Sequence, residues 1–141
     1  HFHILVRQNI DGGITKFMQK LGTGYSMYFN IKYERQGALF GGPFKSKLIH
    51  EDDTYLKHLF GYININPLDI KFPDWENSTK KYAGEMANFL ADYSFSSYKD
   101  LTEGPRIESP ILSIEEFPEY FEDANSFKDF IDNYFVEYDK S

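Results

Sequence analysis

The sequence has 141 residues, contains no cysteine, and carries a formal net charge of −7. This length suits about one domain, and the lack of cysteine excludes disulfides and thiolate metal sites. No run is long and apolar enough for a membrane span, and the start does not resemble a signal peptide. We therefore expect a cytoplasmic protein without a membrane partner.

Charge is distributed unevenly along the chain. Residues 1–50 carry seven Lys/Arg against two Asp/Glu, whereas residues 102–141 carry three against eleven. The basic front half is therefore the part that suits a polyanionic partner. We interpret the acidic tail as a solvated face, and its alternative role is the working surface of an interaction protein.

The front half predicts two strands around a long helix. The opening residues HFHILVRQ alternate in polarity, which is typical of a strand, with one face formed by His1, His3, Leu5 and Arg7. Apolar residues at helical spacing predict a basic amphipathic helix over 14–35. A glycine-rich loop and a short strand over 45–49 follow.

The rest of the chain predicts helices. One begins near Asp52 or Asp53, which can cap it, and ends before Pro67. Two more helices are expected over 79–93 and 126–138. We expect Trp75 to be structural.

The two opening histidines form a candidate metal site. On a strand, His1 and His3 lie on one face about 6.6 Å apart at Cα, so both imidazoles can converge on one ion. Two nearby histidines are also common as ordinary surface or core residues, so the pair alone does not decide the question.

Tyr62 and Asn66 form a second candidate constellation. Four positions apart on a helix, they lie on the same face. A phenol near a divalent cation and a bound phosphate can act as a nucleophile, and an amide oxygen beside two imidazoles suits Mg²⁺ or Mn²⁺. The alternative is that Tyr62 is a packed aromatic and Asn66 a helix C-cap.

Four sequence blocks resemble one known family in order and spacing. They are HFHILV, ITKFMQKLGTGYSMYFNIKYERQGALFGGPFKSKLI, YININP and YSFSSY. Together they resemble the HUH-class tyrosine transposases, in particular the REP-associated branch related to the smallest single-strand insertion-sequence transposases. The match covers about residues 1–101, so the acidic segment 102–141, with one helix, is expected to be a C-terminal extension.

The resemblance implies a fold, an activity and a site. The fold is a ferredoxin-like antiparallel sheet with helices on one face, an α+β architecture. The activity is that of a metal-dependent endonuclease and strand transferase on single-stranded or hairpin DNA. Tyr62 would form a 5′-phosphotyrosine link, and His1, His3 and Asn66 would hold Mg²⁺ or Mn²⁺. Relatives act as monomers or homodimers, so we expect either state.

The sequence departs from the family pattern in three places. Asn64 stands where histidine is usual, and Pro43 stands where arginine is common. Family members also carry a strand and a helix before the histidine motif, whereas this chain begins at the motif, so we expect the sheet to lack its first strand. This departure motivates an alternative function, a domesticated or truncated relative that binds DNA hairpins without cutting them.

Basic and aromatic side chains of the front half are candidate DNA contacts. The basic candidates for phosphate binding are Arg7, Lys16, Lys20, Arg35, Lys45 and Lys47. Candidate stacking platforms for unpaired bases are Tyr25, Tyr28, Phe40 and Phe44. The alternatives are plain solvation for the lysines and helix or loop packing for the aromatic rings.

Overall fold

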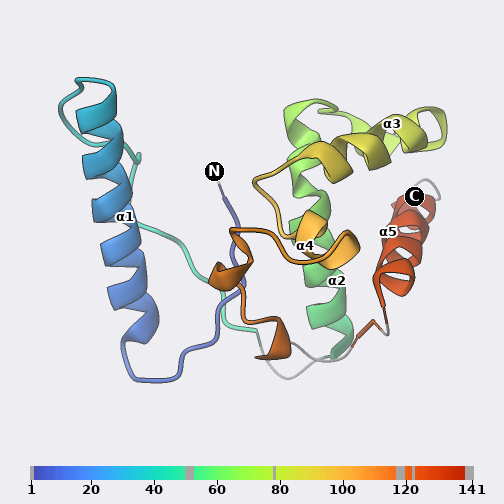
Figure 1. The fold of residues 1–141 in the computed structure, drawn as a ribbon, viewed down its shortest axis with the longest axis horizontal. Helices are drawn as coiled ribbons and strands as arrows, with labels where there is room; N and C mark the ends of the chain where they lie inside the picture. Colours follow the sequence, from blue (N-terminus) through green and yellow to red (C-terminus); the bar gives the residue numbers. More distant parts are fainter. Residues whose placement is uncertain (1, 50–52, 78, 117–119, 122, 139–141) are drawn as a thin grey trace. The chain divides into compact units, whose positions relative to one another are not determined.

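The computed structural model describes residues 2–49, 53–77, 79–116, 120–121 and 123–138. The chain forms two compact units, His1–His50 and Glu51–Ser141. Unit 1 contains the helix α1 (Gly13–Lys32; Figure 1). Unit 2 contains α2 (Asp53–Ile65), α3 (Thr79–Asp92), α4 (Tyr98–Thr102) and α5 (Ala124–Tyr138). Four short 3₁₀ helices complete it: η1 (Asn66–Ile70), η2 (Trp75–Asn77), η3 (Ser109–Ile111) and η4 (Ile114–Glu116).

The predicted ferredoxin-like α+β fold is wrong, because none of the described residues forms a strand and the regular structure is helical. Residues 2–8 and 45–49, both expected to be strands, have no regular structure. A segment of alternating polarity forms a strand only when a neighbouring strand pairs with its backbone hydrogen-bonding groups. Neither segment has such a pairing partner among the described residues. The apolar side of the first segment accordingly remains exposed at Phe2, Ile4 and Val6.

Three helices of unit 2, α2, α3 and α5, agree with the sequence patterns that predicted them, whereas α4 was not predicted. Ile65 is the last residue of α2, directly before the predicted stop, and Pro67 sits in the first turn of η1. A proline is tolerated there because the first N–H groups of a helix have no partner within it. The predicted caps Asp52 and Asp53 lie outside the side chains that the structure describes.

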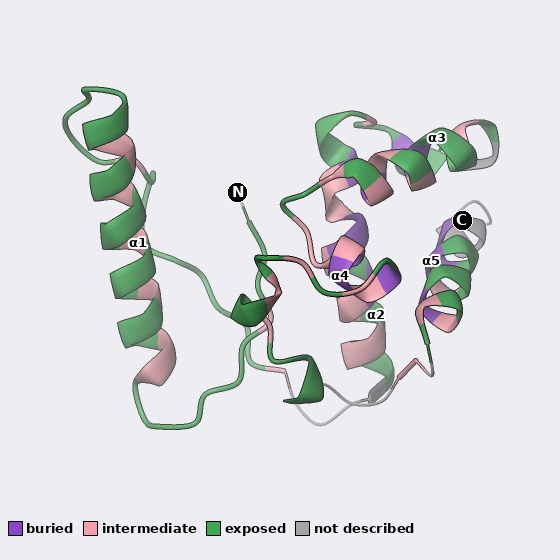
Figure 2. Ribbon diagram, viewed as in Figure 1, coloured by how far each residue is buried: buried purple, intermediate pink, exposed green. Residues whose placement is uncertain are grey.

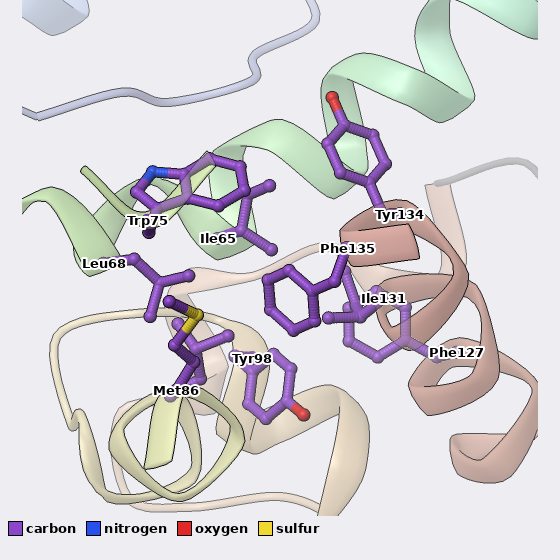
Figure 3. Close-up of a cluster of buried hydrophobic side chains, with 10 residues drawn as sticks. Ile65, Leu68, Trp75, Met86, Tyr98, Phe127, Ile131, Tyr134 and Phe135 are labelled. Atoms are coloured by element: carbon purple, nitrogen blue, oxygen red, sulfur yellow. The ribbon is translucent and has the colours of Figure 1, made fainter. Parts of the chain in front are cut away.

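The core of unit 2 is built from all four of its α-helices and two 3₁₀ helices (Figure 3). Its centre is aromatic: the Phe127 ring lies 5.7 Å from Tyr98 and 5.8 Å from Phe60, measured between ring centroids. Each fully buried side chain of this size contributes about 1.5–3 kcal/mol. The buried apolar residues are Ile65, Leu68, Trp75, Met86, Leu90, Tyr98, Phe127, Ile131, Tyr134 and Phe135.

The helix of the acidic tail belongs to this core. α5 contributes Phe127, Ile131, Tyr134 and Phe135, and it packs against α2, α3 and α4. The predicted domain boundary at residue 101 rested on the resemblance and stays a prediction. Compactness divides the chain between His50 and Glu51 instead.

A buried ion pair fastens the segment after α4 to that helix. Arg106 Nη2 lies 2.5 Å from Asp100 Oδ2, and the Ser109 hydroxyl donates to the other carboxylate oxygen. The guanidinium also donates to the backbone carbonyls of Ser94 and Ser96, both at 2.9 Å. Residues 94–109 therefore close into a compact loop around one arginine.

α2 and α5 approach each other closely at Gly61, which is buried. A Cβ atom there would lie 2.7 Å from Cε1 of Phe130 and 3.4 Å from Cδ2 of Tyr134. The Phe130 ring is itself packed, with its centroid 5.1 Å from that of Phe121. Glycine at this position thus permits the two helices to come together.

We expect Gly61→Ala to lower the free energy of unfolding by about 1 kcal/mol, because the cost of overpacking exceeds the gain in helix propensity. The matched control is Gly84→Ala in α3, where an added Cβ meets nothing within 4 Å. That substitution should stabilise the protein by about 0.5–1 kcal/mol. Urea unfolding of both variants checks the prediction, and a stabilising Gly61→Ala contradicts it.

Unit 1 differs from unit 2 in burial. Figure 2 colours α1 as intermediate or exposed throughout, and none of residues 2–49 is buried. The predicted helix over 14–35 is confirmed with an end at Lys32. Its apolar residues do not enter a core within the unit: Phe17, Leu21, Tyr25 and Tyr28 are each at least 40% exposed.

Candidate functional site

Tyr62 and Asn66 lie together at the end of α2. The Asn66 side-chain amide Nδ2 donates to the Tyr62 hydroxyl oxygen at 3.1 Å. The Tyr62 side chain is 36% exposed, so its hydroxyl lies at the surface of unit 2 rather than in the core. The predicted proximity of this phenol and this amide is confirmed. Asn66 also directly follows the last residue of α2, which is the position of the helix C-cap that the alternative assigned to it.

A carboxylate missed in the sequence adjoins this pair. Asp69 Oδ2 lies 3.4 Å from Asn66 Nδ2, and its Oδ1 accepts a hydrogen bond at 3.0 Å from the indole Nε1 of Trp75. Asp69 follows Asn66 by three positions, a spacing that brings side chains together on a helical turn. This spacing is the feature of the sequence from which the contact between Asp69 and Asn66 could have been predicted.

Asn64 has a separate role in the structure. Asn64 is completely buried, donates to the Phe60 carbonyl at 2.9 Å, and accepts from the Ser97 hydroxyl at 2.9 Å. Two positions after Tyr62 on a helix, it points toward the opposite side. Asn64 therefore links α2 to the start of α4 and does not belong to the Tyr62 site.

The predicted metal ligands fall in different parts of the chain. His1 lies outside the described residues, and His3 is an exposed residue of unit 1. Asn66 belongs to unit 2. No group of three or more His, Cys, Asp or Glu within the described part of the chain is arranged to hold a metal ion. The proposed Mg²⁺ or Mn²⁺ site formed by His1, His3 and Asn66 stays a prediction.

The predicted phosphate contacts are exposed, but they do not form one surface along α1. Lys16 and Lys20 lie one turn apart on one side of the helix, whereas Tyr25 falls on the other side. Arg7, Lys45 and Lys47 belong to irregular segments of unit 1. Lys16 and Lys20 therefore lie on the side of α1 away from Tyr25.

A cluster of aromatic rings and cations covers the C-terminal half of α1. The Tyr25 ring lies 6.3 Å from Tyr28, 6.1 Å from Phe29 and 6.2 Å from Phe40, measured between centroids. Phe40 comes from the loop after α1, and Asn30 holds this loop by donating to the Gly37 carbonyl at 2.9 Å. We call Tyr25, Tyr28, Phe29, Tyr33, Phe40, Lys32 and Arg35 the aromatic–cationic cluster.

Two cations lie against these rings. Lys32 Nζ is 5.4 Å from the Tyr28 ring centroid and 5.6 Å from that of Tyr33, and Arg35 Cζ is 5.7 Å from that of Phe29. Sequence reasoning named Arg35 but missed Lys32 as a site residue. Lys32 could have been predicted from its position one helical turn after Tyr28, which brings the two side chains together.

Lys32 is also held by a direct hydrogen bond. Its ammonium donates to the Tyr28 hydroxyl at 3.0 Å, and this bond raises the pKa of Lys32 above its ordinary value. The lysine therefore remains protonated at neutral pH, next to rings that are about half exposed. Proteins that bind single-stranded nucleic acids commonly combine positive charge with accessible aromatic faces.

Comparisons with protein-family models, curated proteins and solved structures found no match to this chain. Within the described residues, no helix has the length and apolar character that a membrane span requires.

Proposed function

We propose that this protein binds single-stranded or hairpin DNA and nicks and rejoins it through a phosphotyrosine at Tyr62. The observation that carries the proposal is the surface pair of Tyr62 and Asn66, which matches the YININP block in the resemblance to HUH-class tyrosine transposases. The fold gives no support, because the sheet of that family is absent from the described residues.

The chemistry of the proposed reaction is a phosphoryl transfer without net energy input. The Tyr62 phenol oxygen forms a bond to phosphorus, and the bond from phosphorus to the 3′ oxygen breaks. The phenol proton passes to water, and the leaving 3′ oxygen takes up a proton, so a 5′-phosphotyrosine and a 3′-hydroxyl result. The reverse step rejoins DNA because the covalent link retains the bond energy.

The proposed divalent cation, Mg²⁺ or Mn²⁺, would supply charge neutralisation at the phosphate. Its ligands in this proposal are His1, His3 and Asn66. The direct test incubates the protein with an end-labelled hairpin oligonucleotide and Mn²⁺, then separates products on a denaturing gel. A labelled band at the protein's mass, mapped by mass spectrometry to the Tyr62 peptide, supports the proposal. No covalent species with either metal overturns it.

A second candidate function is DNA binding without cleavage. It is favoured by the irregular structure of residues 2–8, which places His3 on no rigid element. In this case DNA binds with the same salt dependence, but no covalent species forms with any metal. The gel assay and a binding titration on the same preparation therefore separate the two functions.

Both functions share a binding surface in the aromatic–cationic cluster of unit 1. Tyr25 lies at its centre and is 49% exposed. We expect Tyr25→Leu to weaken single-stranded DNA binding by roughly 5- to 100-fold, the effect of losing one stacked base. The slope of log K against log salt should remain unchanged, because no charge is removed.

Met27→Leu is the matched control, since Met27 lies on the same helix, is 60% exposed and has no ring. Its affinity for DNA should stay within about twofold of the unmodified protein. Fluorescence anisotropy at several salt concentrations measures both variants. Equal weakening by the two substitutions contradicts a stacking role for Tyr25.

A further inference from the structure

A row of side chains connects the candidate nucleophile to the core of unit 2. The Trp75 indole donates to Asp69 Oδ1 at 3.0 Å, Asn66 Nδ2 lies 3.4 Å from Asp69 Oδ2, and the same Nδ2 donates to Tyr62 at 3.1 Å. The row begins at a side chain that is 4% exposed and ends at one that is 36% exposed. It thus runs from the interior to the surface.

Asp69 determines which way the Asn66 amide faces. An ionised carboxylate can only accept hydrogen bonds, so the NH₂ group of Asn66, and not its carbonyl oxygen, must face Asp69. One N–H then points to the carboxylate and the other to the Tyr62 oxygen. Without the carboxylate, a tyrosine hydroxyl could pair equally well with either end of the amide, since it both donates and accepts.

Trp75 in turn fixes Asp69. The indole is buried in the core, where its ring packs edge-on against Phe135 with centroids 6.1 Å apart. Its N–H is therefore a donor at a fixed position, and it holds one carboxylate oxygen while the other faces Asn66. A buried anchor of this kind limits the rotation of an otherwise exposed acid.

We propose that Asp69 is a positioning residue for the Tyr62 nucleophile, an inference that rests on the proposed function above. By holding the Asn66 amide, Asp69 keeps an N–H donor on the Tyr62 oxygen throughout the reaction. In the rejoining step the 3′-hydroxyl attacks phosphorus and the phenol oxygen leaves with negative charge. A donor already aimed at that oxygen stabilises the charge as it develops.

The informative substitution is Asp69→Asn. The new amide oxygen can still accept from Trp75, but its NH₂ group then meets the NH₂ group of Asn66, so only one of the two bonds is lost. The matched control is Asp74→Asn. Asp74 Oδ1 accepts from Asn77 Nδ2 at 2.7 Å, an acid–amide pair of the same spacing outside the row.

The expected result is a slower chemical step with unchanged binding. At saturating DNA, Asp69→Asn should form and resolve the phosphotyrosine adduct roughly tenfold more slowly in single-turnover assays, as expected for one misdirected hydrogen bond in the transition state. DNA affinity should stay within about twofold, because Asp69 contacts no DNA in this proposal. The emission of Trp75, the single tryptophan, should not shift. Asp74→Asn should match the unmodified protein in all three.

Two results overturn the positioning role. One is an unchanged single-turnover rate in Asp69→Asn, and the other is a rate loss accompanied by shifted Trp75 emission or weaker DNA binding. If the unmodified protein forms no adduct, the proposed function fails first. In that case the NMR signals of the Asn66 side-chain amide still test whether Asp69 pairs with Asn66. A shift in Asp69→Asn but not in Asp74→Asn supports the pairing, and unchanged signals overturn it.

Discussion

Replacing Tyr62 by phenylalanine should abolish the covalent protein–DNA adduct, with a loss on the order of 10³-fold or more, because the substitution removes the attacking atom. The fold should persist, because Tyr62 lies at the surface of unit 2 and phenylalanine keeps its ring, while the hydrogen bond from Asn66 is lost. One such hydrogen bond at a surface contributes about 0.5–1.5 kcal/mol. A denaturing gel with labelled hairpin DNA measures the adduct, and thermal unfolding checks the fold.

Tyr55→Phe is the matched control for this substitution. Tyr55 belongs to the same helix and is 38% exposed, against 36% for Tyr62. It should retain the full adduct yield. An adduct of normal yield in Tyr62→Phe contradicts the proposed nucleophile and assigns the phosphoryl link to another group.

Replacing Arg106 by alanine should lower the free energy of unfolding of unit 2 by roughly 3 kcal/mol, because it leaves the Asp100 carboxylate buried without its cation. The Asp100 side chain is only 2% exposed, and the Arg106 guanidinium is the cation that compensates its charge. The backbone carbonyls of Ser94 and Ser96 lose their donors as well. Urea unfolding followed by Trp75 emission measures the change.

Lys99→Ala is the control, because its ion pair with Glu103 spans 4.0 Å and both side chains are partly exposed, at 27% and 51%. Exposed pairs of this kind contribute little, so a change below about 0.5 kcal/mol is expected. A loss of the same small size in Arg106→Ala contradicts the importance of the buried pair.

The same ion pair predicts a pH dependence. The hydrogen bond from Arg106, assisted by the one from Ser109, holds the pKa of Asp100 below its ordinary value of 3.8. The carboxylate therefore contributes its stability fully above the unfolded-state pKa and loses it as pH falls through the lower folded-state pKa. In Arg106→Ala this loss on acidification should shrink or reverse, because protonation then relieves an unpaired buried charge. Unfolding at neutral pH and near pH 3 compares the two proteins.

Local signals in the sequence predicted α1, α2, α3 and α5 but not α4. Pro67 stands just after the end of α2, and Met86 and Leu90, four positions apart on α3, both enter the core. Trp75 was correctly expected to be structural, since it is buried. Each of these signals acts within one helical turn, where side-chain direction follows directly from the backbone period.

Contacts between segments that are distant in the sequence could not be predicted from these local signals. Alternation in HFHILVRQ suggested a strand, but a strand depends on a partner that the segment itself does not specify. Likewise, no local pattern states that Arg106 returns to Asp100 and the carbonyls before it, or that Asn64 pairs with Ser97, thirty-three positions away. These contacts are decided by packing of the whole unit.

Only the part of the candidate site that depends on local spacing was predicted from the sequence. Tyr62 and Asn66 are separated by one helical turn, so their contact followed from spacing. Asp69 was missed because its role depends on the chain turning into a 3₁₀ helix at Asn66 and on the buried indole of Trp75. Lys32 was missed although its position one turn after Tyr28 predicts the contact that the structure shows between them.

The lack of buried side chains among residues 2–49, the described part of unit 1, has a thermodynamic consequence. A helix of twenty residues with two internal glycines, and with none of its side chains buried, owes little of its stability to desolvation. Ligand association and helix ordering are then linked equilibria, so a polyanion that engages α1 also shifts the helix–coil balance of the segment. The observed affinity would be the intrinsic affinity reduced by the entropy of that ordering.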